Sequence, residues 1–188
     1  MISTVKVLNR LWLEGIARGE ITGLPERWYL ISIYTNPSQL FLTDSACISL
    51  RRQGCVGMLP VMFADATESN FEAVKTKEPH TVLFGDNEAR QIMAFIQGAK
   101  RDTQPAVLIV HCDAGVSRSG AIGTWINDFL EMDYSKFKKN NPYIQPNPHV
   151  LKKMRDISGM NDKWFGGKQL EIIPQDEKEI IIPNSKTL

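Results

Sequence analysis

Four short runs of β-branched, aromatic and other apolar residues recur along the chain, and helical patterns stand between them. The runs lie at residues 4–8, 28–34, 56–63 and 106–111. Strands that are separated by helices pair in parallel, because each helix carries the chain back across one face of the sheet. The sequence therefore predicts an α/β fold with a central, mostly parallel sheet that is flanked by helices.

Two amphipathic helices are expected. The first begins at Asp86, whose side chain suits an N-cap, and it presents one face at spacings of three and four residues. That face comprises Ala89, Ile92, Met93, Ile96 and Lys100, of which the first four are apolar. The second helix follows Ser119 and carries an apolar stripe made of Ile122, Trp125, Ile126, Phe129 and Leu130. We expect the second helix to be buried against the sheet.

The length of 188 residues suits one domain with a short extension. Residues 140–148 include three prolines, which predicts an ordered loop before a last helix at residues 149–158. The domain is expected to span residues 1–159. Residues 160–188 mix glycine, proline and charge with two isoleucine clusters, a composition that suits either an edge strand or a flexible tail.

The charge balance and the apolar runs exclude several classes of protein. The chain has 22 lysines and arginines against 21 aspartates and glutamates, so its net charge of +1 gives no reason to expect a nucleic-acid partner. Its apolar runs are much shorter than the roughly 18–20 residues of a membrane span. The first residues lack the basic start, apolar middle and cleavage site of a secretory signal. We therefore expect a cytoplasmic protein that does not bind membranes.

The cysteines also limit the interpretation. Cys47, Cys55 and Cys112 are an odd number without CxxC spacing, which argues against a disulfide framework and against a cysteine-rich zinc site. No metal and no cofactor are expected. Cys47 and Cys55 are interpreted as core thiols, with the alternative that one of them resolves an oxidised Cys112.

The segment at residues 105–120 runs from a buried strand through a tight loop into the second helix, and it predicts an anion site. Backbone N–H groups converge in such a loop, and the start of the helix adds partial positive charge. Gly115 lets the loop backbone approach a ligand. Arg118 offers a planar fork that can bind two phosphate oxygens at once.

Cys112 is the predicted nucleophile of this segment. Inward N–H groups, a helix N-terminus and a guanidinium together favour its thiolate, whereas an isolated cysteine would be interpreted as an inert buried thiol. A phosphoryl group transferred to the sulfur would leave a thiophosphate, and the Ser119 hydroxyl would then stabilise the departing thiolate. His111 is expected to orient the loop rather than to exchange protons.

The residues from His111 to Ser119 read HCDAGVSRS, which resembles the HCxxGxxRS signature of the cysteine-based protein-tyrosine phosphatase superfamily. The form of the signature is most similar to the dual-specificity branch and to compact phosphatases of bacteria and phages. A fainter resemblance extends over residues 5–159. It includes residues 30–33, similar to an early strand, and residues 145–147, similar to the loop before the last helix.

The resemblance implies a covalent cysteinyl-phosphate intermediate, no metal, and a loop that binds the phosphate. Catalytic roles would then fall to Cys112, Arg118 and Ser119. Substrate binding would fall to the loop residues Asp113, Ala114, Gly115, Val116, Ser117 and Arg118, with His111 in support.

The resemblance further implies an aspartate on a separate loop that protonates the leaving group. Asp65 follows a strand-like run and is the preferred candidate, although residues 68–84 then form an insertion before the next helix. Asp86 is the rival, but its expected role as an N-cap is sufficient to explain it. Asp113 is expected to face solvent at the mouth of the pocket and to be a poor acid.

A phosphorylated protein or peptide is the expected partner. Phosphotyrosine is the first substrate, and phosphoserine or phosphothreonine is the second, since no segment resembles the phosphotyrosine-recognition loop of tyrosine-only enzymes. The acidic signature loop disfavours highly anionic lipids and RNA ends. Three alternatives stay open: a phosphopeptide-binding pseudo-phosphatase, a phosphatase of small molecules, and an arsenate-reducing or redox protein. The sequence makes no prediction of the oligomeric state.

Overall fold

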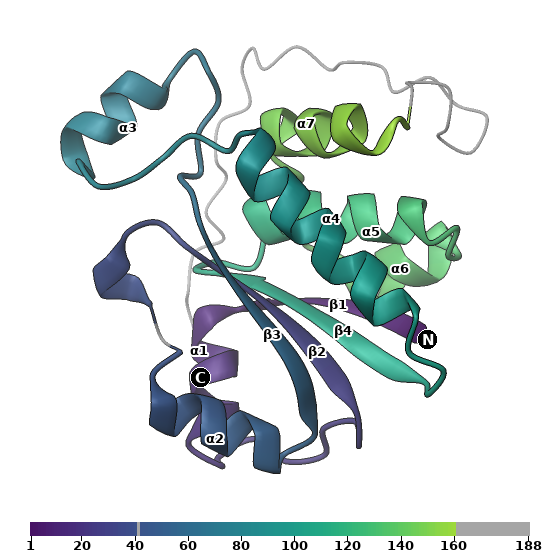
Figure 1. Cartoon of the computed structure of the whole chain (residues 1–188). Coiled ribbons are helices and arrows are strands. Elements are labelled where there is room, and N and C mark those ends of the chain that lie inside the picture. The colour runs from purple at the N-terminus through teal and green to yellow at the C-terminus, as the bar shows by residue number, and fades with distance from the viewer. Residues whose placement is uncertain (41, 161–188) are drawn as a thin grey trace, which may run out of the picture.

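The computed structural model describes residues 1–40 and 42–160 (Figure 1). Its centre is a four-stranded, all-parallel sheet in the order β1-β4-β2-β3. The strands are β1 (Ile2–Asn9), β2 (Trp28–Tyr34), β3 (Cys55–Met62) and β4 (Ala106–Cys112). Each lies within two residues of its predicted bounds. The predicted α/β class and the parallel sheet are therefore confirmed.

Helices cover both faces of this sheet (Figure 1). On one face lie α1 (Arg10–Ala17) and α2 (Asp44–Arg52), and on the other lie α4 (Asp86–Lys100), α5 (Arg118–Phe129) and α7 (Pro148–Ser158). The shorter α3 (Phe71–Lys77), α6 (Tyr134–Asn140) and a 3-10 turn at Pro37–Gln39 complete the described elements. The segment at residues 68–84, expected to be an insertion, holds α3.

Two apolar clusters follow from this layering. The larger one joins the sheet to α4, α5 and α7, and Trp125 at its centre is fully buried. The smaller one joins α1 and α2 to the opposite face around the fully buried Trp28. The apolar stripe predicted for α5 is thus buried against the sheet, as expected. Both clusters include buried side chains of β4 and its neighbouring strands. The close packing on both faces makes the end of β4 a rigid position for a functional site.

The starts of these two helices differ slightly from their predictions, by one residue in the N-cap of α4 and by two residues in the start of α5. The N-cap of α4 is Gly85, whose N–H donates to Glu88 Oε2 at 2.9 Å, and Asp86 is the first helical residue. The prediction of Asp86 as the N-cap was therefore wrong, because the backbone of Gly85 takes that position. Helix α5 begins at Arg118, so Ser119 already lies in its first turn.

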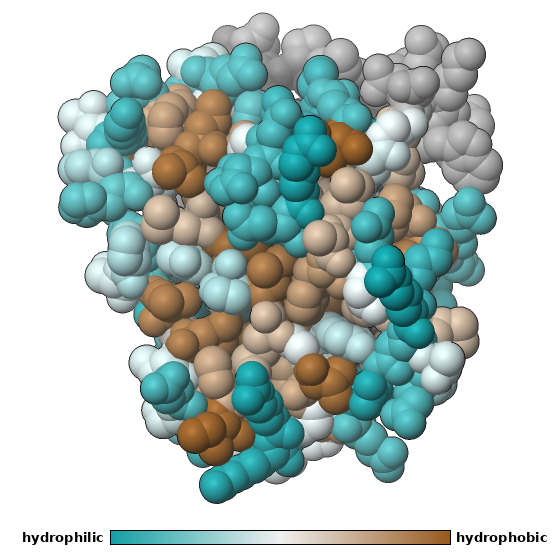
Figure 2. Space-filling model, in the orientation of Figure 1, coloured by the Kyte–Doolittle hydropathy of each residue, from teal (hydrophilic) through white to brown (hydrophobic). Residues whose placement is uncertain are grey.

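Both edge strands are blocked. At β1, the Asn141 side chain accepts from the Val7 N–H at 2.7 Å and donates to the Val5 carbonyl at 3.1 Å, as a neighbouring strand would. At β3, Pro60 has no N–H to offer. Apolar side chains gather in the middle of the face drawn in Figure 2, among polar ones. The contacts of Asn141 also anchor the loop between α6 and α7, which is ordered as predicted.

Helix α7 ends at Ser158, and its C-cap residue Gly159 adopts a left-handed conformation with φ of 67°. The predicted boundary of the domain falls at this residue. The extension expected at residues 160–188 lies outside the described residues except for Met160. Over the described part of the chain, no helix is long and apolar enough to cross a membrane.

Candidate active site

The predicted anion loop lies at the carboxyl end of β4, where residues 113–117 join that strand to α5. Ser117 is the N-cap of α5, but its side chain makes no capping hydrogen bond. The Ser117 hydroxyl instead donates to Asp65 Oδ1 at 2.7 Å. The first N–H groups of a helix have no partner within it, so an uncapped α5 N-terminus can bind an anion.

Gly115 shapes the loop through its backbone. Its φ is 72°, a left-handed conformation that residues with a Cβ rarely adopt. A Cβ built there would lie 2.6 Å from the Leu8 carbonyl carbon and 2.7 Å from the Asn9 nitrogen. Because both contacts are backbone atoms of β1, they cannot move aside. Only glycine fits where the loop passes this strand.

Cys112 and Ser119 meet at the base of the loop. The Cys112 sulfur lies 3.0 Å from the Ser119 Oγ, and both residues are buried. A hydroxyl that stabilises a thiolate must lie this close to the sulfur. The thiol therefore has a hydrogen-bonding partner in the first turn of α5.

Arg118 is also buried, and its guanidinium is held on two sides. Nη1 donates to Thr35 Oγ1 at 2.9 Å and to the Phe63 carbonyl at 3.0 Å, while Nη2 donates to Asp113 Oδ2 at 2.9 Å. The buried Nε has no hydrogen-bond partner among the described residues. An unpaired buried N–H of a cation is costly, so this atom points to a bound anion as its partner.

Asp113 is exposed as expected, but its carboxylate also has cationic neighbours. Its side chain is 41% exposed, but its carboxylate pairs with Arg118 and lies 3.9 Å from Arg10 Nη1 instead of facing solvent alone. The expectation overlooked that a short acidic side chain next to the cysteine reaches the guanidinium across the loop. A negative charge thus already lies beside the predicted anion site.

The loop is further fixed by backbone hydrogen bonds from neighbouring segments. The Arg10 N–H donates to the Asp113 carbonyl at 3.1 Å, and the Gln145 N–H donates to the Val116 carbonyl at 3.1 Å. The Asn147 N–H donates to the Ser117 carbonyl at 3.2 Å. Because these carbonyls are bound from outside, the opposite side of the loop keeps its N–H groups for a ligand. Ala114 is exposed at the rim.

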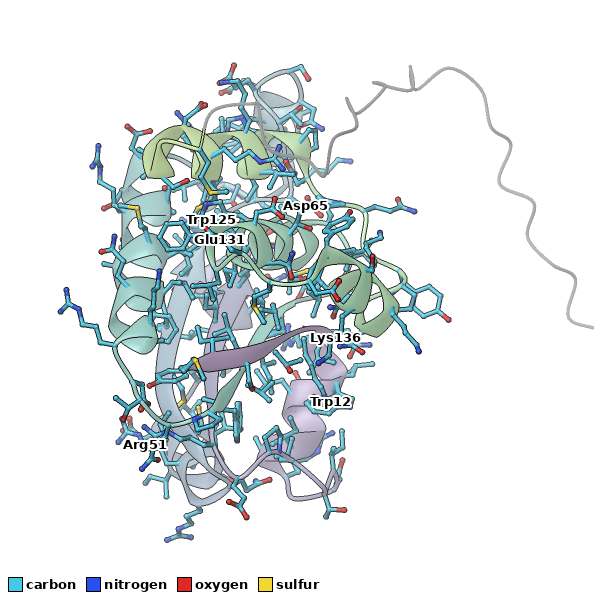
Figure 3. All side chains as sticks on the ribbon, turned by 90° about the vertical axis from the view of Figure 1, so that its right-hand side faces the viewer. Trp12, Arg51, Asp65, Trp125, Glu131 and Lys136 are labelled. Atoms are coloured by element: carbon cyan, nitrogen blue, oxygen red, sulfur yellow. The ribbon has the colours of Figure 1, made fainter. Side chains whose placement is uncertain are left out.

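The structure brings Asp65 to this loop and leaves Asp86 outside it. Asp65 Oδ1 accepts from Ser117 Oγ and, at 2.9 Å, from Asn147 Nδ2. Figure 3 shows Asp65 beside α7, far from Arg51 on α2. Asp86 is exposed, and its carboxylate pairs with Lys153 Nζ at 3.1 Å. Of the two candidates for the acid, Asp65 alone contacts the predicted phosphate loop.

His111 lies beneath the loop, and its Nε2 is 2.7 Å from Ser32 Oγ on β2. Burial lowers the pKa of His111 to about 4. The ring is therefore neutral at neutral pH, a state that suits a role in orienting the strand end.

The remaining cysteines lie away from this loop. Cys55 is buried, and burial raises the pKa of its thiol to about 12, which makes it a poor nucleophile. Cys47 is half-buried rather than fully inside the core, because α2 lies on the surface of the sheet. No cysteine forms a disulfide, and no cluster of metal-binding side chains occurs within residues 1–40 and 42–160.

Three residues of the site were missed from the sequence alone, namely Thr35, Asn147 and Arg10. For Asn147 a signal existed, since asparagine before Pro148 is typical of a helix N-cap. Thr35 gives no such signal, because its contact with Arg118 depends on where β2 ends. Arg10 reaches the loop because β1 pairs in register with β4.

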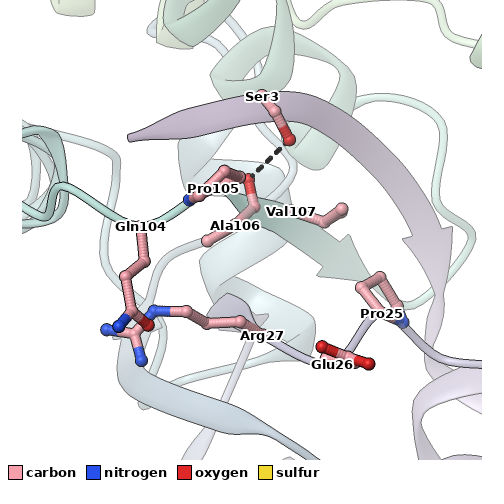
Figure 4. A pocket seen from close by; sticks show the side chains of 8 residues that line it. All are labelled: Ser3, Pro25, Glu26, Arg27, Gln104, Pro105, Ala106 and Val107. Carbon is pink, nitrogen blue, oxygen red and sulfur yellow. Dashed lines mark hydrogen bonds between the residues drawn. The ribbon is translucent and has the colours of Figure 1, made fainter.

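A separate hollow lies at the opposite end of the sheet, where Ser3, Arg27 and Gln104 are among its lining residues (Figure 4). Two of the polar side chains there already have partners. Ser3 Oγ donates to the Ala106 carbonyl at 3.1 Å, and the Arg27 guanidinium pairs with Asp102. Ligands of parallel sheets bind at the carboxyl ends of the strands, which this hollow does not adjoin.

No family model matches the chain, and no curated protein matches it either. Among solved structures, the chain is similar to the active form of Tk-PTP, with 11% identity over 84% of this chain and 92% of the other, and a TM-score of 0.46. It is also similar to a human tyrosine phosphatase-like serine/threonine/tyrosine-interacting protein, with 17% identity over 72% of this chain and 78% of the other, and a TM-score of 0.37. A third similar structure is that of DUSP15, with 20% identity over 82% of this chain and 87% of the other, and a TM-score of 0.36.

Proposed function

We propose that this protein is a phosphatase that hydrolyses phosphate monoesters through a cysteinyl-phosphate intermediate. The observation that carries the proposal is the buried Arg118, whose Nε lacks a partner within the described residues, in the same loop as Cys112. The contact of Asp65 with that loop supports an acid for the leaving group. Phosphotyrosine in proteins or peptides is the proposed substrate, and phosphoserine and phosphothreonine are secondary ones.

In the first step, the phosphate group of the substrate binds the loop N–H groups and Arg118. The Cys112 thiolate attacks phosphorus, so that a P–S bond forms while the P–O bond to the leaving group breaks. Asp65 gives its proton to the departing oxygen. The alcohol or phenol leaves, and the phosphoryl group stays on the sulfur.

In the second step, water attacks the thiophosphate, and its proton passes to Asp65, which acts as the base. The P–S bond breaks, inorganic phosphate forms, and the electron pair returns to Cys112. The Ser119 hydroxyl, 3.0 Å from the sulfur, stabilises the returning thiolate. In this mechanism Arg118 and the N–H groups provide all the positive charge that the phosphoryl group meets, so no metal is proposed.

A phosphorylated protein or peptide is thus the proposed partner, and the cytoplasm is the proposed location. A cysteine nucleophile works only while its sulfur is reduced, and none of the three cysteines is paired. A thiol-reducing compartment suits this requirement.

The test is hydrolysis of para-nitrophenyl phosphate by the wild-type chain and by Cys112→Ser, measured without added metal and with vanadate as an inhibitor. Cys47→Ser is the matched control, because it also removes a thiol but lies on α2. We expect vanadate-sensitive hydrolysis that the Cys112 variant loses and the control keeps.

Binding of vanadate by the Cys112→Ser variant should persist, because the loop and Arg118 remain. If the variant hydrolyses the substrate as fast as the wild type, the covalent mechanism is wrong. If the folded wild-type chain binds vanadate but hydrolyses nothing, the protein binds phosphate groups without turning them over.

A further inference from the structure

The amide of Asn147 links the start of α7 to the loop that carries Asp65. Its Nδ2 donates to Asp65 Oδ1 at 2.9 Å and to the Ala66 carbonyl at 3.3 Å, and the residue is only 6% exposed. We propose that Asn147 is a positioning residue that sets the orientation of the Asp65 carboxyl group for proton transfer. The inference rests on the proposed function, in which Asp65 is the general acid.

The other end of the amide is fixed as well. Asn147 Oδ1 accepts from the N–H groups of His149 at 3.0 Å and of Val150 at 3.2 Å, and so caps α7. An amide has one oxygen and one NH₂ group, and its orientation follows from its partners. Because the oxygen is committed to the helix, the NH₂ group must face Asp65. Helix α7 therefore holds the donor in place.

This arrangement distinguishes the two oxygens of Asp65. Oδ1 accepts from both Ser117 and Asn147, whereas Oδ2 has no hydrogen-bond partner in the part of the chain that the structure describes. Both donors favour a proton on Oδ2 instead of Oδ1, because Oδ1 already accepts two hydrogen bonds. A general acid must present its proton to the leaving oxygen, and the free Oδ2 is the atom that can do so.

The segment around Asp65 also packs against residues 82–84, which in turn contact the same helix. The Ala64 N–H donates to the Val82 carbonyl at 2.8 Å, and the rings of Phe63 and Phe84 pack with centroids 4.6 Å apart. His149 Nε2 lies 2.8 Å from the Phe84 carbonyl. With the backbone placed by these contacts, the rotation of the carboxyl group is set by its two donors, the Ser117 hydroxyl and the amide of Asn147.

The test separates the contact with Asp65 from the capping of α7. Asn147→Ser keeps a capping oxygen but is too short to reach Asp65. Asn147→Asp also caps the helix, but it replaces the donor with a second carboxylate. Asp133→Ser is the matched control, because Asp133 caps α6 through the Lys136 N–H and makes no hydrogen bond to Asp65. Hydrolysis of phenyl phosphate, a poor leaving group, is compared with that of para-nitrophenyl phosphate.

We expect Asn147→Ser to lower kcat about tenfold or more for phenyl phosphate and clearly less for para-nitrophenyl phosphate, since only the former needs full protonation. In an Asp65→Ala background, Asn147→Ser should cause no further loss on phenyl phosphate. For Asn147→Asp, the basic limb of the pH profile should move to higher pH, because two adjacent carboxylates hold a proton more strongly. The control variant Asp133→Ser should change neither the ratio of kcat for the two substrates nor the dependence of the rate on pH.

A purely structural role would lower both rates by the same factor, in line with a lower melting temperature, and would overturn the inference. An additional loss in the Asp65→Ala background would overturn it too. These outcomes differ from failure of the proposed function, which would appear as hydrolysis that persists in Cys112→Ser or as no hydrolysis by the wild type.

Discussion

The Ser117 hydroxyl lies 2.7 Å from the carboxylate of Asp65, although 52 positions separate the two residues. Asp65 follows β3 and Ser117 follows β4, with β2 between these strands. The carboxyl ends of parallel strands meet at one edge of a sheet, and this is how the two residues come together. The contact commits the Ser117 side chain to Asp65 and leaves the N-terminus of α5 uncapped.

Replacing Asp65 with asparagine should reduce hydrolysis in proportion to the demand for a proton. We expect a loss of about 10²–10⁴ in kcat for phenyl phosphate and a smaller loss for para-nitrophenyl phosphate. The side chain keeps its size and an acceptor for Ser117, so the fold should not change. Steady-state rates with both substrates are the measurement.

Asp86→Asn is the matched control for Asp65→Asn. Asp86 is an exposed first-turn residue of α4 that pairs with Lys153, so we expect its loss to leave both rates unchanged. If Asp86→Asn shows the leaving-group dependence and Asp65→Asn does not, the acid has been assigned to the wrong residue.

Gly115→Ala should remove activity by deforming the loop. The added Cβ would meet the backbone of Leu8 at 2.6 Å while φ is 72°, and such strain costs about 1–3 kcal/mol or more. The control is Gly98→Ala on the exposed face of α4, where nothing lies within 4 Å of the new Cβ. That change should raise the free energy of unfolding by about 0.5–1 kcal/mol.

Urea unfolding and hydrolysis of para-nitrophenyl phosphate are measured for both glycine variants. We expect Gly115→Ala to lose stability and turnover together, whereas Gly98→Ala should gain stability and keep turnover. A Gly115→Ala protein with unchanged rates would show that the loop does not need this conformation.

Asp113→Asn should strengthen the binding of phosphate esters. The Asp113 carboxylate accepts from Arg118 Nη2 at 2.9 Å, where it repels an incoming dianion and competes for the guanidinium. Removing a partly exposed charge is worth about 0.5–1 kcal/mol, which corresponds to about a two- to fivefold lower KM.

The measurement for Asp113→Asn is KM and vanadate inhibition at low and at high salt, with Asp86→Asn as a control of equal charge change. Screening should shrink the difference as salt increases. A higher KM in Asp113→Asn would mean instead that this carboxylate holds Arg118 in its binding orientation.

Much of the fold could be predicted because its signals are local. The four strands and the buried face of α5 follow from runs and periodicity that neighbouring residues determine by themselves. The N-cap of α4 was misplaced by one residue, because the choice between Gly85 and Asp86 depends on backbone geometry. Helices α3 and α6 escaped prediction, since both are short and lack a clear apolar stripe.

The residues of the candidate site also divide into those that local sequence signals predict and those that depend on the tertiary fold. Cys112, Gly115, Arg118 and Ser119 lie in one contiguous signature, so the sequence places them together. Thr35 and Asn147 contact the site only because separate strands and loops converge on it, and no spacing along the chain encodes that convergence. Asp113 was visible in the signature, but its contact with Arg118 depends on the exact path of the loop.

The last prediction concerns pH, and it rests on the buried His111. Burial lowers the pKa of His111 from 6.5 to about 4. At pH values between these two, the imidazole is mostly protonated in the unfolded chain and mostly neutral in the folded chain. The contribution of this histidine to stability is therefore complete above about pH 6.5 and is lost as pH falls towards about pH 4. Between about pH 7.5 and about pH 5, this linkage costs about 2 kcal/mol.

His111→Gln has no titrating group at this position and should lack that loss. Two other groups do not obscure the comparison. The hydrogen bonds from Tyr29 and Arg27 lower the pKa of Asp102, so the contribution of Asp102 to folding stability is lost only at pH values below the usual carboxyl range. Burial raises the pKa of Asp128, so its contribution to stability changes with pH in the opposite direction. Both are present in wild type and variant, and they cancel in the difference. Urea unfolding at the two pH values checks this, and equal losses in the two proteins would mean that His111 is not held neutral.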